Sequence, residues 1–222
     1  ENYVRAWTIG KMGVYFKNSI ILTAATLFVS AIIGSMASYI LAKYTFKGKS
    51  FVYILFLAGM MIPIQTVIIP LAFTFGKLGI VDNLPVLVLL YSAFCLSMTV
   101  FIVTGYMKGL PDELEEAAVM DGAGHGIIFF RIILPLSMPA IASASIFNFV
   151  SAWNNLLFPL VFISKDSMKT ISIGLLSFFG AYTSDYGAVM AAIGVSIIPP
   201  IIMYILLQEK MEKGLTAGAV KG

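Results

Sequence analysis

The sequence predicts an all-α integral membrane protein, a polytopic bundle of helices. Of its 222 residues 59% are hydrophobic and only 11% are charged, with a mean hydropathy of +0.96. Soluble domains carry charge on about 25% of their residues. The apolar residues also gather in five long runs without Asp, Glu, Lys, Arg or His. A soluble helical bundle would instead alternate polar and apolar faces.

Each of the five runs is long enough to cross a bilayer, which takes about 20 residues. They cover residues 18–41, 51–75, 84–106, 140–163 and 187–207 of a single membrane domain, 1–222. Prolines interrupt several of them, at positions 63, 70, 159, 199 and 200. Five spans place the loop 107–138 and the tail 208–222 on one side of the membrane. We expect a sixth span before Glu1.

The positive charges predict the orientation. Eight of them would lie on the side of the loop and tail: Lys43, Lys47, Lys49, Lys108, Arg131, Lys210, Lys213 and Lys221. Six would lie opposite: Arg5, Lys11, Lys17, Lys77, Lys165 and Lys169. Because cytoplasmic loops carry more Lys and Arg, the loop 107–138 and the C-terminus are expected in the cytoplasm.

The composition also excludes several functions. Ion-coupled transporters usually carry ionisable groups inside the membrane, and these spans have none, although backbone carbonyls can still bind sodium. There is no G-x-x-x-x-G-K-[ST] loop for nucleotide phosphates, so any nucleotide would have to be bound by a partner. The net charge of +3 is scattered, which argues against nucleic acid, and Cys95 is alone. We expect no catalytic or metal-binding residues and no cofactor bound by this chain.

Uncharged polar side chains mark a candidate solute path. They are Gln65 in the second run and Asn148, Trp153, Asn154 and Asn155 in the fourth. Amides donate and accept hydrogen bonds without net charge, which suits a hydroxyl-rich solute. The alternative is hydrogen bonding between helices, and stripes of small residues also predict close packing, within this chain or with another subunit. One stripe is Ser30, Gly34, Ser38 and Ala42, and the other is Ala140, Ala144, Asn148 and Ala152.

An acidic block stands out in the loop 107–138. Residues 110–113, LPDE, predict the start of a short helix over 112–121, because acids complement the helix dipole there. Gly122 or Gly124 would end it in a left-handed cap. A second, apolar segment over 127–133 would complete a two-piece helical hook. The alternative is a surface loop that is acidic for solubility.

The block contains Glu116-Ala117-Ala118, three residues, Gly122, nine residues and then Ile132-x-Leu134-Pro135. This matches the EAA signature, and the chain therefore resembles the membrane subunit of an ABC importer. The segments "SAWNNLLFPLVF" and "GLTAGAVKG" make it similar to sugar permeases of the maltose-transporter, MalG-like type. Many of these have Glu where Asn155 stands, which leaves any role of that acid open here.

The resemblance implies a sugar importer, expected to take up an oligosaccharide by alternating access. The hook would be a coupling helix that docks on an ATPase subunit through Glu116, Ala117, Ala118, Asp121 and Gly122, while His125 would contact the ATPase or only solvent. The partners would be a second permease subunit in a heterodimer, two ATPase subunits holding ATP and Mg, an extracellular sugar-binding protein and membrane lipid. The chain would be no enzyme and would lie in a prokaryotic cytoplasmic membrane.

Three rival functions fit parts of the sequence. A permease of the same superfamily could carry another solute, such as glycerol phosphate or an amino acid. The tail sequence, residues 214–222, argues against an amino acid. A secondary sugar transporter would work without an ATPase. A membrane scaffold would only recruit a soluble partner.

Overall fold

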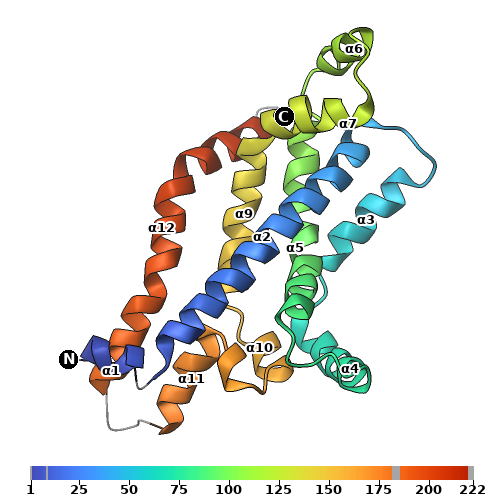
Figure 1. Cartoon of the computed structure of the whole chain (residues 1–222). Coiled ribbons are helices and arrows are strands. Elements are labelled where there is room, and N and C mark those ends of the chain that lie inside the picture. The colour runs from blue at the N-terminus through green and yellow to red at the C-terminus, as the bar shows by residue number, and fades with distance from the viewer. Residues whose placement is uncertain (1, 9, 182–185, 220–222) are drawn as a thin grey trace. The chain divides into compact units, whose positions relative to one another are not determined.

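The computed structural model describes residues 2–8, 10–181 and 186–219, and in these ranges every regular element is a helix (Figure 1). The longer helices are α2 (Met12–Lys43), α3 (Lys49–Gly59), α4 (Ile64–Lys77), α5 (Leu84–Met107), α9 (Met138–Trp153), α11 (Ile171–Ala181) and α12 (Tyr186–Ala219). The shorter ones are α1 (Asn2–Thr8), α6 (Glu113–Met120), α7 (His125–Ile128), α8 (Leu134–Leu136) and α10 (Leu157–Phe162). A π-helical turn, η1 (Phe129–Ile133), and a 3-10 turn, η2 (Asp166–Met168), complete the set.

Three helices are long and apolar enough to cross a membrane, namely α2, α5 and the part Tyr186–Gln208 of α12. The number rises to five if two bent pairs each count as one span. One pair is α3 with α4, and the other is His125–Leu136 with α9. The predicted fold class, an all-helical membrane bundle, is confirmed. The predicted tail runs as helix to Ala219, and residues 220–222 lie outside the described residues.

Two of the apolar runs do not form one continuous helix. The run 51–75 breaks between α3 and α4, where Pro63 precedes α4 in an extended conformation, since a proline disfavours helix at the residue before it. The run 140–163 breaks between α9 and α10. There the Asn155 side-chain oxygen accepts a hydrogen bond from the Phe158 N–H, and Pro159 has no N–H to continue the helix of α9.

The chain forms two compact units. Unit 1 contains Glu1–Thr26, Ile62–Tyr91 and Phe149–Met203, and unit 2 contains Leu27–Met61, Ser92–Asn148 and Tyr204–Gly222. Because α2, α5, α9 and α12 continue from one range to the next, each contributes to both units. The six positive residues predicted for one side all belong to unit 1, and the other eight to unit 2, with Lys221 outside the described residues.

Small polar residues fill the interior of unit 2, while large apolar ones cover its outside. Ser35, Ser38 and Thr104 are fully buried, whereas Phe28 and Phe51 are 70% and 71% exposed. In a soluble protein the large apolar residues would be buried and the small polar residues would face the solvent. In lipid the apolar surface costs nothing, and small residues let helices approach closely.

Candidate functional site

The acidic block forms the hook, which we define as α6, α7 and the turn between them. Asp112 precedes α6 and Asp121 follows it. Gly122 has a φ of 78°, a left-handed conformation that glycine adopts without steric cost. The Ala123 N–H then donates to the Ala118 carbonyl, as in a glycine-terminated helix. Of the two glycines that the sequence offered as the cap, Gly122 takes that role.

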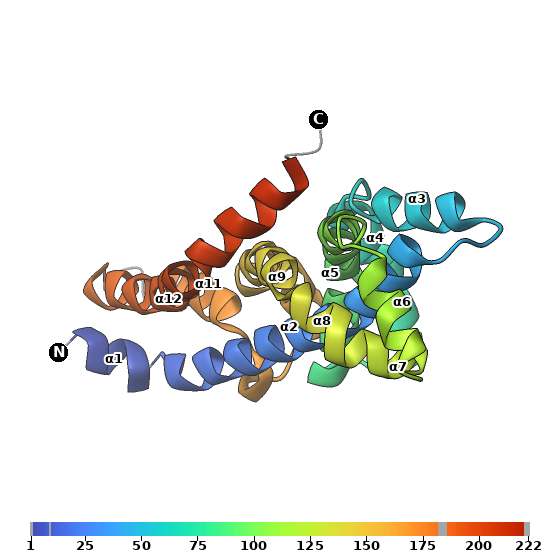
Figure 2. The ribbon, with the colours of Figure 1, turned by 90° about the horizontal axis from the view of Figure 1, so that it is seen from above.

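The hook packs against the end of unit 2 formed by α2 and α5 (Figures 1 and 2). Ala118, Ile128 and Phe129 are buried in one apolar cluster with Tyr39 of α2 and Met107 of α5. The side of α6 that contains Ala118 therefore faces its own chain. Burial of this apolar surface, worth roughly 25 cal/mol per Å², holds the hook on the bundle.

A lysine at the end of α2 ties down the segment that leads into α6. The Lys43 ammonium donates to the Leu110 carbonyl and to the Asp112 carboxylate, both at 2.6 Å. Its side chain is only 6% exposed, so both acceptors compensate for its lost hydration. The hydrogen bond and the charge of Lys43 hold the pKa of Asp112 below its usual range.

The other side of the hook is open to solvent. Glu116, Ala117 and Asp121 are exposed, and next to them Val119 is 55% and Met120 87% exposed. Sequence reasoning did not single out these two apolar residues, whose only local signal is a Val-Met pair among acids. In the described part of the chain, no group of three or more His, Cys, Asp or Glu residues could hold a metal ion.

The end of the EAA signature coincides with an irregular helix. Residues Phe129–Ile133 form a π-helical turn just before Pro135. Pro135 has no N–H to donate to the carbonyl four residues earlier, and such defects are typical places for a widened turn. The helical stretch His125–Leu136 then meets α9 with a bend of 70°. The signature thus sets the angle at which the hook leaves the bundle.

Asn148, a predicted solute-path residue, belongs to unit 2 and is buried there. Its side-chain amide donates to the Thr99 hydroxyl at 2.8 Å, and that hydroxyl donates to the Cys95 carbonyl. Close beside this point, a Cβ on Gly34 would overlap the Thr99 side chain. Asn148 thus makes the kind of interhelical hydrogen bond that the packing alternative expects.

The other four predicted residues belong to unit 1. Trp153 is buried, donates its indole N–H to the Ser196 carbonyl and stacks on Phe149 with ring centroids 5.7 Å apart. Asn155 is half-buried and bonded to the start of α10. Gln65 and Asn154 are exposed. Of these four, Gln65 and Asn154 therefore present their side chains most openly to a solute.

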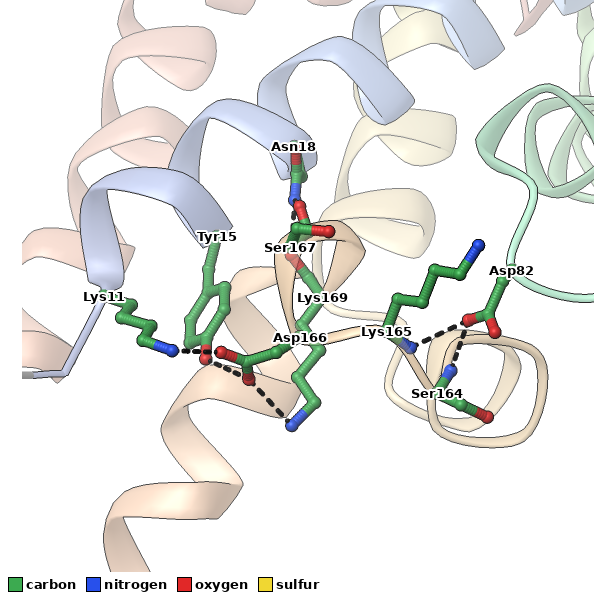
Figure 3. Close-up of polar contacts among 9 residues, drawn as sticks. All are labelled: Lys11, Tyr15, Asn18, Asp82, Ser164, Lys165, Asp166, Ser167 and Lys169. Carbon is green, nitrogen blue, oxygen red and sulfur yellow. Dashed lines mark hydrogen bonds and ion pairs between the residues drawn. The ribbon is translucent and has the colours of Figure 1, made fainter.

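Unit 1 also contains a polar network that could not be predicted from the sequence (Figure 3). It fixes the connection between α10 and α11, residues 163–170, to the start of α2. The Asp166 carboxylate accepts hydrogen bonds from Lys11 and Tyr15, at 2.6 and 2.9 Å, and pairs with Lys169 at 3.1 Å. Asn18 donates to two carbonyls of the connection. The hydrogen bonds from Lys11, Lys169 and Tyr15 hold the pKa of Asp166 far below its usual range.

Asp82 fixes the other end of the same connection. Its carboxylate accepts the backbone N–H groups of Ser164 and Lys165 at 2.6 and 2.9 Å (Figure 3). These hydrogen bonds, first that of Lys165, lower the pKa of Asp82. Asp82 itself has a φ of 54°, which Asp tolerates better than most residues. Asp82 thus holds the residues just before Asp166, while Asn18 holds those that follow it.

Comparison with known proteins identifies relatives over almost the whole chain. Residues 30–217 match the family described as binding-protein-dependent transport system inner membrane component. A diacetylchitobiose uptake system permease protein of Streptomyces coelicolor is 34% identical over all of this chain and 74% of the relative. A trehalose/maltose transport system permease protein of Thermococcus litoralis is 37% identical over all of this chain and 81% of the relative.

A third relative and a solved structure agree with these matches. A probable starch degradation products transport system permease protein of Thermoanaerobacterium thermosulfurigenes is 34% identical over all of this chain and 80% of the relative. The solved structure is a bacterial ABC transporter involved in the import of the acidic polysaccharide alginate. Its chain superimposes with a TM-score of 0.79 at 24% identity, over 94% of this chain and 78% of that one. This last likeness shows the fold.

Proposed function

The chain belongs to the family of binding-protein-dependent transport system inner membrane components, and we propose that it is the permease subunit of an ATP-driven sugar importer. The observation that carries the proposal is the hook. Its EAA signature forms a short helix closed by Gly122, anchored on unit 2 along one side and exposed along the other. Such a surface suits docking by an ATPase subunit.

The chain works with partners in this proposal. Two ATPase subunits bind ATP and Mg, a second permease subunit completes the pathway, and an extracellular binding protein delivers the sugar. The hook lies on the cytoplasmic side. Glu116, Ala117, Asp121 and Gly122 contact the ATPase directly. Ala118 is buried against the chain's own cluster, so it holds α6 close to the bundle.

The mechanism is the conversion of a rigid-body motion into a change of access. When ATP closes the ATPase dimer, the hooks of the two permeases are carried along. The apolar cluster beneath the hook contains residues of α2 and α5, and it passes the displacement to these helices. Gln65 and Asn154, exposed in unit 1, are candidate contacts of the sugar, together with Asn148, Trp153 and Asn155 if their contacts change during transport.

Two variants test the coupling role of the hook. Glu116→Lys reverses a charge on the exposed side. Gly122→Asp adds a carboxylate at a positive φ, which strains the turn although a Cβ there would meet no atom within 4 Å. We expect both to abolish sugar uptake by vesicles containing the complete complex, while the chain still reaches the membrane at normal levels. Glu113→Lys, an exposed residue of the same helix outside the signature, is the matched control. Normal uptake by the Glu116 and Gly122 variants would contradict the assignment.

The solute is proposed from the relatives, whose names specify diacetylchitobiose, trehalose or maltose, and starch degradation products. We therefore expect an oligosaccharide. The test is to purify the complex with its extracellular binding protein and to measure which sugars that protein binds and the vesicles accumulate. Accumulation of glycerol phosphate in place of any sugar would overturn this part of the proposal.

A further inference from the structure

A chain of three hydrogen bonds joins the hook to the end of α2. The Tyr39 hydroxyl donates to Oε2 of Glu115 in α6 at 2.8 Å. The hydroxyls of Tyr39 and Tyr44 lie 3.2 Å apart. The Tyr44 hydroxyl in turn lies 2.8 Å from Nδ1 of His125, at the start of α7. This series of hydrogen bonds therefore begins at Glu115 on one helix of the hook and ends at His125 on the other.

Counting protons gives these bonds one direction. A carboxylate only accepts, so Tyr39 uses its single proton on Glu115. The Tyr39–Tyr44 bond then needs the proton of Tyr44. His125 must consequently donate from Nδ1 to the Tyr44 oxygen. All three bonds exist together only when Nδ1 of His125 carries a proton. If the proton sits on Nε2 alone, Tyr44 donates to His125 and the middle bond is lost.

The hydrogen bonds stabilise the position of the hook because two of the groups involved are buried. Tyr39 is 4% exposed and lies in the apolar cluster beneath α6. The other oxygen of Glu115, Oε1, is buried and has no hydrogen-bond partner among the described residues. The Tyr39 hydroxyl is therefore the one described donor that satisfies this carboxylate, and a buried acceptor left without a donor is costly.

We propose that Tyr39, Tyr44 and His125 are positioning residues that lock the hook to α2 through Glu115. Lys43, bonded to Asp112 just before α6, lies between the two tyrosines in sequence and adds a contact at the entrance of the hook. With both helices of the hook tied to α2, a push on α6 or α7 moves α2 instead of bending the loop. The inference rests on the proposed function, because it assumes that the ATPase acts on the hook.

The proton count gives a spectroscopic test that does not depend on transport. His125 is the single histidine of the chain. In the complex reconstituted in lipid with ¹⁵N-labelled histidine, the difference spectrum between wild type and His125→Asn isolates its ring nitrogens. We expect a proton on Nδ1 in wild type and its loss from Nδ1 in Tyr44→Phe. Tyr106→Phe is the matched control, because Tyr106 packs against the same cluster without a hydroxyl hydrogen bond among the described residues. A wild-type His125 protonated on Nε2 alone would overturn the proposal.

Transport measurements test the consequence. We expect Tyr39→Phe and Tyr44→Phe, each of which removes two of the three hydrogen bonds, to keep ATP hydrolysis but to move at least about fivefold fewer sugars per ATP, since the loss of even one hydrogen bond shifts an equilibrium about fivefold. His125→Asn, whose amide can donate from the same position, should retain more coupling than His125→Ala. If Glu116→Lys abolishes uptake while Tyr44→Phe leaves sugars per ATP unchanged, the lock is refuted and the proposed function stands. If Glu116→Lys is also silent, the proposed function fails as well.

Discussion

Single glycines decide how closely the helices of unit 2 approach one another. A Cβ on Gly34 of α2 would overlap the Thr99 side chain of α5, and a Cβ on Gly59 of α3 would overlap the Ser97 hydroxyl. Gly34 belongs to one of the stripes of small residues in the sequence. It packs within this chain, which is one of the two kinds of packing that such a stripe predicts. The partner of Gly59 could not be predicted, because nothing local links residue 59 to residue 97.

The contact between Gly59 and Ser97 yields a reciprocal prediction. Gly59→Ala should lower the thermal stability of the purified protein relative to Gly76→Ala, since the new methyl group overlaps the Ser97 oxygen and forces this hydroxyl to move, at a cost below the about 1–3 kcal/mol typical of overpacking against a rigid neighbour. Ser97→Ala removes that oxygen and leaves only the Ser97 Cβ, 3.7 Å away, in ordinary contact. The double variant should therefore regain most of the loss.

Thermal unfolding of the four proteins in detergent measures this effect. Gly76→Ala serves as the control, because a Cβ on Gly76 would meet no atom within 4 Å. If the double variant is as unstable as Gly59→Ala, the helices do not approach as described.

At the scale of elements, the hook and the connection 163–170 differ in how far they could be foreseen. The start and end of α6 lie within one residue of the predicted ends, because acids, proline and glycine act on the backbone next to them. The connection 163–170 has no comparable local pattern that predicts its contacts. Asp166 bonds to Lys11 and Tyr15, which lie 155 and 151 positions earlier in the sequence. Its role therefore depends on the packing of α2 beside the connection.

Asp166 gives the connection a defined pH dependence. Its pKa is lower in the folded protein, so its contacts stabilise the fold fully above the ordinary Asp value of about 3.9. This stabilisation is lost as the pH falls through the lower folded pKa. We expect wild type to lose thermal stability below about pH 4, and Asp166→Asn to be less stable at pH 7 but to lose less on acidification.

The comparison requires unfolding curves at neutral and acid pH. Glu113→Gln, at an exposed carboxylate of α6, controls for general charge effects. Since Asp166 is 44% exposed, each of its ion pairs contributes at most about 1 kcal/mol. Equal acid sensitivity of wild type and Asp166→Asn would show that these contacts do not persist in solution.

Across the whole molecule, the positive charges fall into two groups, one in each compact unit. The six positive residues expected on one side of the membrane belong to unit 1, and the described members of the other set belong to unit 2. The grouping follows the chain, because the charge-free runs separate the charged segments from one another. Which set faces the cytoplasm is an expectation from the positive-inside rule.

Cysteine labelling tests the orientation. In a Cys95→Ala background, Lys47→Cys in unit 2 and Ser167→Cys in unit 1 each place one thiol at an exposed position. A membrane-impermeant maleimide should label Ser167→Cys in right-side-out vesicles and Lys47→Cys only in inside-out vesicles. The reverse pattern would place the hook outside the cytoplasm and would contradict its proposed contact with an ATPase.

The membrane class, the apolar runs, the hook and the family resemblance could all be predicted from the sequence. These depend on run length, on composition and on residues a few positions apart. The folded chain was needed to show that Asn148 bonds Thr99 across 49 positions, that Trp153 is buried, and that Tyr44 contacts His125 across 81 positions. Such contacts form when helices far apart in sequence pack side by side. Their partners are chosen by packing geometry and by the need of buried polar groups for hydrogen bonds, which no local pattern encodes.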